Sequence, residues 1–198
     1  MSVQPVAIPA DDYRWNLPAR GPVGMYGLIA AEAAIFTIFV VAYIFYIGKS
    51  LTGPQPRDVL RIPVFFTICL LASSLTIHFA LKLLKGGGVR SFALCWLLTI
   101  ALGTVFLAGT FREWRHLIYD EGLTIQTNLF GTTYYSLVGL HAFHVTAGLV
   151  ALTTVLLFAF LGDVGRQHAE RVEVLSMYWH FVDAVWVVVF IVVYVVGR

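Results

Sequence analysis

Several acidic and histidine side chains lie inside long apolar stretches of this chain. A charged group is energetically unfavourable in such a stretch unless it has a polar partner. Glu32 is the only formally charged residue between positions 25 and 47. His180 and Asp183 lie three positions apart in another apolar stretch, so they share one face of a helix. A carboxylate at membrane depth costs about 2.5–3.5 kcal/mol or more unless it is protonated or paired. Each of these groups therefore predicts either a polar partner or a chemical role.

The histidines add a second set of candidates. His141 and His144 are three positions apart near the middle of an apolar stretch, and His78 lies four residues before Lys82 near the end of another. Such groups could form a proton path, or they could bind a metal or a haem, which takes ligands from different helices at matched depth. They could equally be hydrogen-bonded groups that hold helices together.

No spacing among these residues is diagnostic of a metal or haem site, so we expect no metal ligands and no catalytic residue. Helix packing is the favoured interpretation for five side chains: His78, His141, His144, His180 and Asp183. For Glu32, a protonation step linked to function and a purely structural role carry equal weight, because it is a lone carboxyl among Ala and Ile residues.

Five apolar stretches position these groups. A helix that crosses ~30 Å of hydrocarbon needs ~20 mostly apolar residues. The predicted spans are residues 25–47, 62–82, 91–111, 129–161 and 174–196. They are hydrophobic around most of their circumference, unlike soluble amphipathic helices, and they are too long for the ~10-residue alternating strands of a membrane β-barrel. We therefore predict an all-α integral membrane bundle of five transmembrane helices over residues 24–198, preceded by an N-terminal segment, residues 1–23.

Composition supports the membrane prediction and excludes other classes. Of the 198 residues, 59% are hydrophobic and 12% are charged, whereas a soluble domain carries about 25% charged residues. Two cysteines exclude a disulfide-stapled scaffold, and a net charge of +2 gives no case for nucleic-acid binding. The cations Lys82, Lys85 and Arg90 cluster in one short loop, which predicts that this loop and the N-terminal segment are cytoplasmic.

Two further expectations concern residues near or within the spans. Trp179 lies near the start of the last span, which is typical of an aromatic anchor at the membrane interface. Ser73, Ser74 and Thr76 lie within the second span, where we expect their hydroxyl groups to bond back to carbonyl groups of their own helix.

One stretch is more specific than these general patterns. Residues 178–186, with the sequence Tyr-Trp-His-Phe-Val-Asp-Ala-Val-Trp, closely resemble the last helix of subunit III of the haem-copper oxidases, the cytochrome c and quinol oxidases. Residues 139–148 resemble the glycine and His-x-x-His helix of that family, and residues 70–76 its double-serine segment. Glu32 stands where the family has a buried glutamate. The resemblance extends from Gly24 onwards and is to the short, five-helix bacterial form.

The resemblance implies an accessory subunit of a proton-pumping terminal oxidase, with no catalytic residue and no cofactor in this chain. Haems and copper would lie in the partner subunits I and II, and the chain would pack against subunit I, support proton uptake and protect the active site from inactivation. It also implies contact with membrane phospholipids and a multi-pass location in a bacterial plasma membrane, with a cytoplasmic N-terminus.

The resemblance also assigns roles to particular residues. Glu32 would be a buried, carbodiimide-reactive carboxyl that faces subunit I, and the polar residues of the last two spans would be helix-packing groups. His168 and Glu173 match a histidine and a glutamate that precede the last helix in the family. Arg166, by position alone, could contact the phosphate of a lipid.

Three alternatives stay open. The chain could accompany a nitric oxide reductase, which would keep the fold and change only the partner. It could be an independent small proton-coupled transporter that uses Glu32 and Asp183 as proton carriers, although transporters often show internal repeats and this sequence has none. It could also be a membrane cytochrome.

Overall fold

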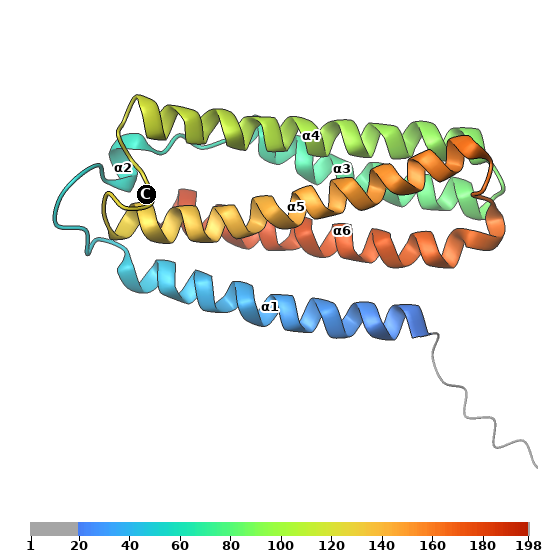
Figure 1. Cartoon of the computed structure of the whole chain (residues 1–198), viewed down its shortest axis with the longest axis horizontal. Helices are drawn as coiled ribbons and strands as arrows, with labels where there is room; N and C mark the ends of the chain where they lie inside the picture. Colours follow the sequence, from blue (N-terminus) through green and yellow to red (C-terminus); the bar gives the residue numbers. More distant parts are fainter. Residues whose placement is uncertain (1–19, 198) are drawn as a thin grey trace, which may run out of the picture.

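The computed structural model describes residues 20–197 as a bundle of long helices (Figure 1). Five are long and apolar enough to cross a membrane: α1 (Arg20–Tyr46), α3 (Val64–Lys85), α4 (Val89–Tyr119), α5 (Leu129–Leu161), and α6 (Ala169–Phe190) with its π-helical continuation η2 (Ile191–Val196). The short helices are α2 (Pro56–Val59) and η1 (Arg166–His168). The prediction of an all-α bundle of five membrane helices is confirmed. Most of the predicted N-terminal segment, residues 1–19, lies outside the described residues.

The long helices run alternately in opposite directions, so the connections gather at two ends (Figure 1). The N-side end holds the start of α1, the turn at residues 86–88 and the connection at residues 162–165. The C-side end holds the connections at residues 47–63 and 120–128, together with the end of the last helix. Glu32, His144 and His180 lie well inside their helices, away from both ends.

Local signals explain where α5 begins and ends. Asn128 caps its start, because the side-chain oxygen accepts a hydrogen bond from the Gly131 N–H at 2.8 Å. Gly162 ends it with a positive φ of 88°, and its N–H donates to the Ala159 carbonyl at 3.3 Å. A left-handed residue at this position is readily adopted only by glycine.

Helix α4 is longer than the predicted span, which was placed at residues 91–111. It continues to Tyr119 because residues 112–119 contain neither proline nor glycine and include residues that tolerate a helix. Its 31 residues span about 46 Å at ~1.5 Å per residue, whereas the 22 residues of α3 span about 33 Å. The last two turns of α4 therefore extend beyond the start of α3 at the C-side end.

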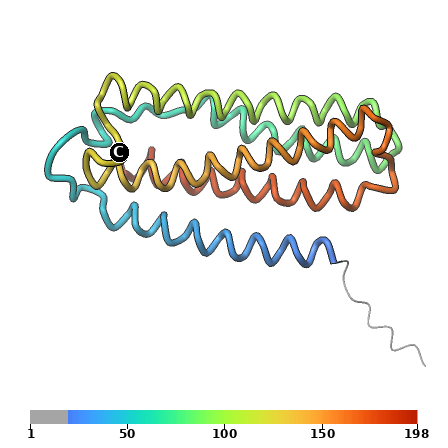
Figure 2. Tube along the Cα trace, viewed as in Figure 1, coloured from blue at the N-terminus to red at the C-terminus, as the bar shows by residue number. Residues whose placement is uncertain are grey.

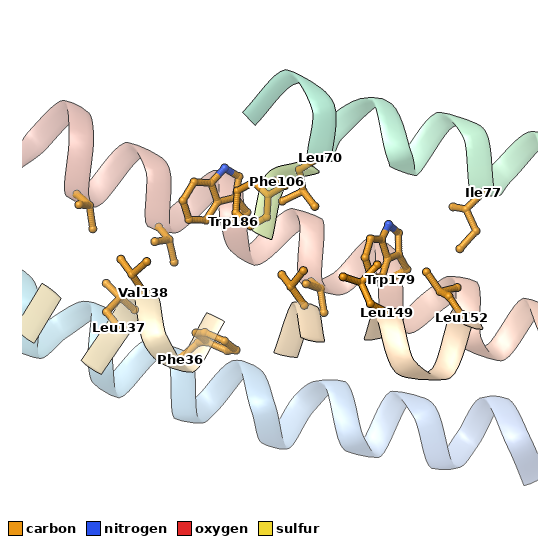
Figure 3. Close-up of a cluster of buried hydrophobic side chains, with 14 of the residues drawn as sticks. Phe36, Leu70, Ile77, Phe106, Leu137, Val138, Leu149, Leu152, Trp179 and Trp186 are labelled. Atoms are coloured by element: carbon orange, nitrogen blue, oxygen red, sulfur yellow. The ribbon is translucent and has the colours of Figure 1, made fainter. Parts of the chain in front are cut away.

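Helix α6 packs against α1, α3 and α5, and its tryptophans occupy the core (Figure 3). Trp179 is 0% exposed. Its ring lies between Gly103 of α4 and Gly148 of α5, where added Cβ atoms would come within 2.9 and 2.8 Å of ring carbons. The expectation that Trp179 is an interface anchor is wrong, because the two glycines leave a slot that an indole fills completely.

Helix α1 lies along one edge of the bundle (Figure 2) and packs mainly against α5 and α6. Of its 27 residues, Phe36 and Tyr43 are the buried ones. Isoleucines and valines of its outer face are exposed, among them Ile38 at 67% and Val41 at 58%. This face is left for lipid or for another protein.

Candidate functional site

The carboxyl group of Glu32 meets the ring of His144 where α1 crosses α5. Oε2 of Glu32 lies 3.1 Å from Nε2 of His144, and the two side chains are 23% and 7% exposed. Phe36, one helical turn beyond Glu32, covers the histidine with 5.0 Å between ring centroids. A polar contact therefore joins the two helices near their middle, and an aromatic ring shields it.

The second ring nitrogen of His144 restricts where the protons lie. Nδ1 is 2.8 Å from the carbonyl oxygen of Leu140, which can only accept, so Nδ1 carries a hydrogen. With a neutral imidazole, Nε2 is an acceptor and the Glu32 carboxyl must be the protonated donor. With an ionised carboxylate, the imidazole must be a cation. In both states the pair shares one proton and has no net charge, which lowers the cost of its position in a membrane.

His141, one turn before His144, has a different environment. Its side chain is buried at 1% exposure and stacks on Trp186 with 5.0 Å between ring centroids. The ring of Phe106 lies edge-on at 5.8 Å. Within residues 20–197, neither ring nitrogen of His141 has a hydrogen-bond partner. The His-x-x-His pair is thus divided between the contact with α1 and the aromatic core.

His180 and Asp183, predicted to share a helix face, meet the same residue of α3. The hydroxyl oxygen of Ser74 lies 3.0 Å from Nδ1 of His180 and is also hydrogen-bonded to Oδ2 of Asp183. A hydroxyl has one hydrogen. When Asp183 is ionised, Ser74 donates to the carboxylate and accepts the Nδ1–H of His180.

Two indole N–H groups extend this contact along α3. Trp179 donates to the hydroxyl oxygen of Ser73 at 2.8 Å, and Trp186 donates to that of Thr67 at 3.2 Å. Ser73 also donates to the Leu70 carbonyl at 2.6 Å, as expected for a serine that bonds to its own helix. We call the whole set the α3–α6 seam, formed by Thr67, Ser73, Ser74, Trp179, His180, Asp183 and Trp186.

Replacing Ser74 by alanine should destabilise the chain by about 1–3 kcal/mol, because a buried carboxyl loses its hydrogen bond. Asp183 is 3% exposed, its Oδ2 accepts the Ser74 hydroxyl, and its Oδ1 has no partner within the described range. The thermal unfolding midpoint, measured by circular dichroism in mild detergent, checks this. Thr154→Val is the control, since among residues 20–197 Thr154 bonds only to the Val150 carbonyl, on an exposed face. Equal midpoints for Ser74→Ala and the unchanged chain would contradict the assignment.

His78 does not join either group. It is exposed on α3, and its ring lies 6.0 Å from that of Phe79. It makes no side-chain hydrogen bond to any residue in the range 20–197. Glu32, His78, His180 and Asp183 therefore form no single cluster, although three of them contact a neighbouring helix.

The residues that precede the last helix lie at the N-side end. Glu173 forms an ion pair with Lys85 at 2.8 Å, which ties the start of α6 to the end of α3. Nδ1 of His168 accepts the Gly165 N–H at 3.2 Å. Arg166 is exposed, and its contact with a lipid phosphate stays a prediction.

Sequence reasoning did not identify a third polar contact, at the C-side end. The hydroxyl of Tyr194 lies 3.0 and 2.9 Å from the two carboxylate oxygens of Glu113, and 3.5 Å from the hydroxyl of Tyr134. Glu113 belongs to the part of α4 that was expected to lie beyond the span. The absence of helix breakers after residue 111 was the signal that could have placed Glu113 on a helix.

The ring nitrogens of these histidines are the atoms that would bind a metal ion or a haem iron. Both ring nitrogens of His144 are taken by Glu32 and Leu140, and Nδ1 of His180 is taken by Ser74. Over residues 20–197, no three His, Cys, Asp or Glu side chains converge as ligands of one metal ion. The residues present fit hydrogen-bonded helix contacts better than a ligand set.

Comparison with known proteins decides the family. A family model described as cytochrome c oxidase subunit III matches residues 23–198. The chain belongs to the cytochrome c oxidase subunit III family. The predicted resemblance is therefore confirmed, and the chain is an accessory subunit of a haem-copper oxidase and a multi-pass membrane protein.

Individual members of the family match nearly end to end. Cytochrome c oxidase subunit 3 of Alkalihalophilus pseudofirmus is 31% identical over 193 residues, covering 96% of this chain and 94% of that protein. The corresponding protein of Corynebacterium diphtheriae is 37% identical over 185 residues, covering 90% and 89%. Cytochrome bo(3) ubiquinol oxidase subunit 3 of Pseudomonas aeruginosa is 31% identical over 177 residues, covering 88% and 85%.

Proposed function

We propose that this chain is a subunit III that carries no redox centre and no catalytic residue, in a proton-pumping oxidase of a bacterial plasma membrane. Its partners are subunits I and II of that oxidase and membrane phospholipids. The haems and copper belong to those partner subunits. The named relatives include subunits of both cytochrome c and quinol oxidases, so family membership fits either electron donor.

The observation that carries this proposal is the Glu32–His144 pair on the edge helix. The pair holds one shared proton without net charge, on a helix that buries little of its own surface in this chain. Glu32 is still 23% exposed, so its carboxyl group is open to contact by a neighbouring subunit. A neighbouring subunit that covers this face would enclose a carboxyl able to take up and release a proton.

The arrangement supports a role in shaping the surroundings of subunit I. The hydrogen bonds of the α3–α6 seam and the aromatic core hold α3, α4, α5 and α6 together as one packed unit, and α1 packs on this unit. Subunit I would then be held by the outer face of α1, with Glu32 close to its proton entrance. The exposed cations Lys82, Lys85 and Arg90 at the N-side end favour a cytoplasmic position for that end.

Removal of this chain from the purified oxidase tests the proposal. We expect the remaining complex to keep its haem spectrum and its initial rate of turnover, because no reacting group has been lost. Its activity should then decay after fewer turnovers than that of the intact complex, and re-addition of the chain should restore the lifetime. Loss of haem, or an unchanged lifetime, would contradict the proposal.

A further inference from the structure

A cleft of about 1210 Å³ lies at the C-side end, between the start of α3 and the last turns of α4. It exists because α4 extends past α3, and because an extended connection, residues 60–63, runs beside it (Figure 1). Phe66 lines it and packs on Gly109, where any Cβ atom would overlap the phenyl ring. The cleft includes neither Glu32 nor any residue of the α3–α6 seam.

Three arginines give this cleft a positive charge. Arg61, Arg112 and Arg115 line it, and all three are exposed. Within residues 20–197, none of the three forms an ion pair. Arg61 belongs to the connection before α3, whereas Arg112 and Arg115 belong to the end of α4. Two separate segments therefore contribute guanidinium groups to the same cleft.

The other charged groups that line the cleft already have partners. Glu113 accepts the hydroxyl of Tyr194 on both carboxylate oxygens. His116 is 2.6 Å from Asp120 and 3.6 Å from Glu121. The three arginines outnumber the two carboxylates that line the cleft, Glu113 and Asp120, so the formal charge of the cleft is positive.

The remaining wall is apolar and lies at the depth where a membrane changes from hydrocarbon to headgroups. Phe111 is 54% exposed and Ile62 43% exposed, both line the cleft, and each lies next in sequence to one of its arginines. Helix α4, at about 46 Å, exceeds the ~30 Å hydrocarbon core, so its last turns reach the headgroup region. A ligand that fits has an anionic head for the guanidinium groups and apolar tails for the phenyl rings.

We propose that this cleft binds the phosphate of an anionic phospholipid, with phosphatidylglycerol as the simplest example. Guanidinium groups bind phosphate oxygens in a bidentate manner, and clustered cations at a membrane surface each add to the attraction for anionic lipid. The acyl chains lie along Phe111 and the exposed apolar side of α3. The site is at the opposite end of the bundle from Arg166, and it does not depend on the proposed oxidase function.

Site-specific photo-cross-linking tests the proposal on the tagged full chain together with the subunits that co-purify with it. Phe111→p-benzoylphenylalanine places the probe in the cleft. Phe160→p-benzoylphenylalanine is the matched control, because Phe160 is 67% exposed at the N-side end of α5. Both are reconstituted in nanodiscs with equal amounts of phosphatidylglycerol and phosphatidylcholine, irradiated, and the adducts are identified by mass.

The proposal predicts that phosphatidylglycerol adducts are enriched at position 111 relative to position 160. Changing Arg61, Arg112 and Arg115 together to glutamine should remove the enrichment, with a loss of about fivefold or more for each strong contact. Changing Lys82, Arg90 and Arg171 to glutamine at the other end should leave it unchanged.

Three results would overturn the proposal. Equal lipid composition at positions 111 and 160 would show no selectivity. Cross-links from position 111 to a peptide of another subunit would make the cleft a protein interface. Loss of the enrichment in excess inorganic phosphate, but not in chloride of equal ionic strength, would make it a site for free phosphate.

Discussion

Replacing Trp179 by alanine should lower the free energy of unfolding by about 3–5 kcal/mol, the range for a fully buried large aromatic residue. The ring is 0% exposed and fills the slot between Gly103 and Gly148, so alanine leaves a cavity that two rigid helices cannot close. The substitution also removes the hydrogen bond from the indole N–H to Ser73, which is 2.8 Å long. The thermal or denaturant midpoint of the purified chain in mild detergent measures the loss.

Two further variants make this result specific. Phe160→Ala is the control, because it deletes an aromatic ring that is 67% exposed. Gly148→Leu tests the same slot from the other side, since added atoms would collide with the indole, and overpacking costs about 1–3 kcal/mol. The slot interpretation fails if Trp179→Ala and Phe160→Ala unfold at the same midpoint.

Substitutions of Glu32 should separate its structural contribution from its proton chemistry. Glu32→Gln keeps a donor for Nε2 of a neutral His144, so its stability should stay close to that of the unchanged chain. Glu32→Ala leaves that nitrogen without a partner, at a cost of about 1–3 kcal/mol. Both variants should assemble with a full haem content, and both should inactivate after several-fold fewer turnovers, because neither holds the shared proton.

The number of turnovers before inactivation, measured by oxygen consumption of the purified complex, checks this expectation. Glu170→Gln is the matched control, since Glu170 is an exposed carboxylate at the start of α6 with no ion pair in the range 20–197. Unchanged lifetimes in both Glu32 variants would show that the shared proton has no part in turnover. Complete loss of haem would instead indicate that Glu32 is needed for assembly.

The fold could be predicted from the sequence because its cause is local. Stretches of about twenty apolar residues need only be long enough to cross a membrane, and each of the five was recognisable by itself. The shared face of His180 and Asp183 followed from helical spacing in the same way. The helix ends were less predictable, and α4 runs to Tyr119 because residues 112–119, although they include four charged or histidine residues, contain no helix breaker.

The partners of the polar residues could not be predicted, because they depend on how each helix is rotated against its neighbours. Glu32 and His144 are 112 positions apart, and Ser74 and Asp183 are 109 positions apart. Hydropathy carries no information about such pairs. Trp179 shows the same limit, since the glycines that admit its ring belong to two other helices.

We expect this chain to be a haem-free subunit of a haem-containing oxidase. The most direct test is a reduced-minus-oxidised optical spectrum of the complex captured through an affinity tag on this chain, from actively respiring membranes in mild detergent. We expect the haem signals of an oxidase in the complex and a colourless isolated chain. A coloured isolated chain would make it a membrane cytochrome, and a colourless complex would contradict the oxidase assignment and favour an independent transporter.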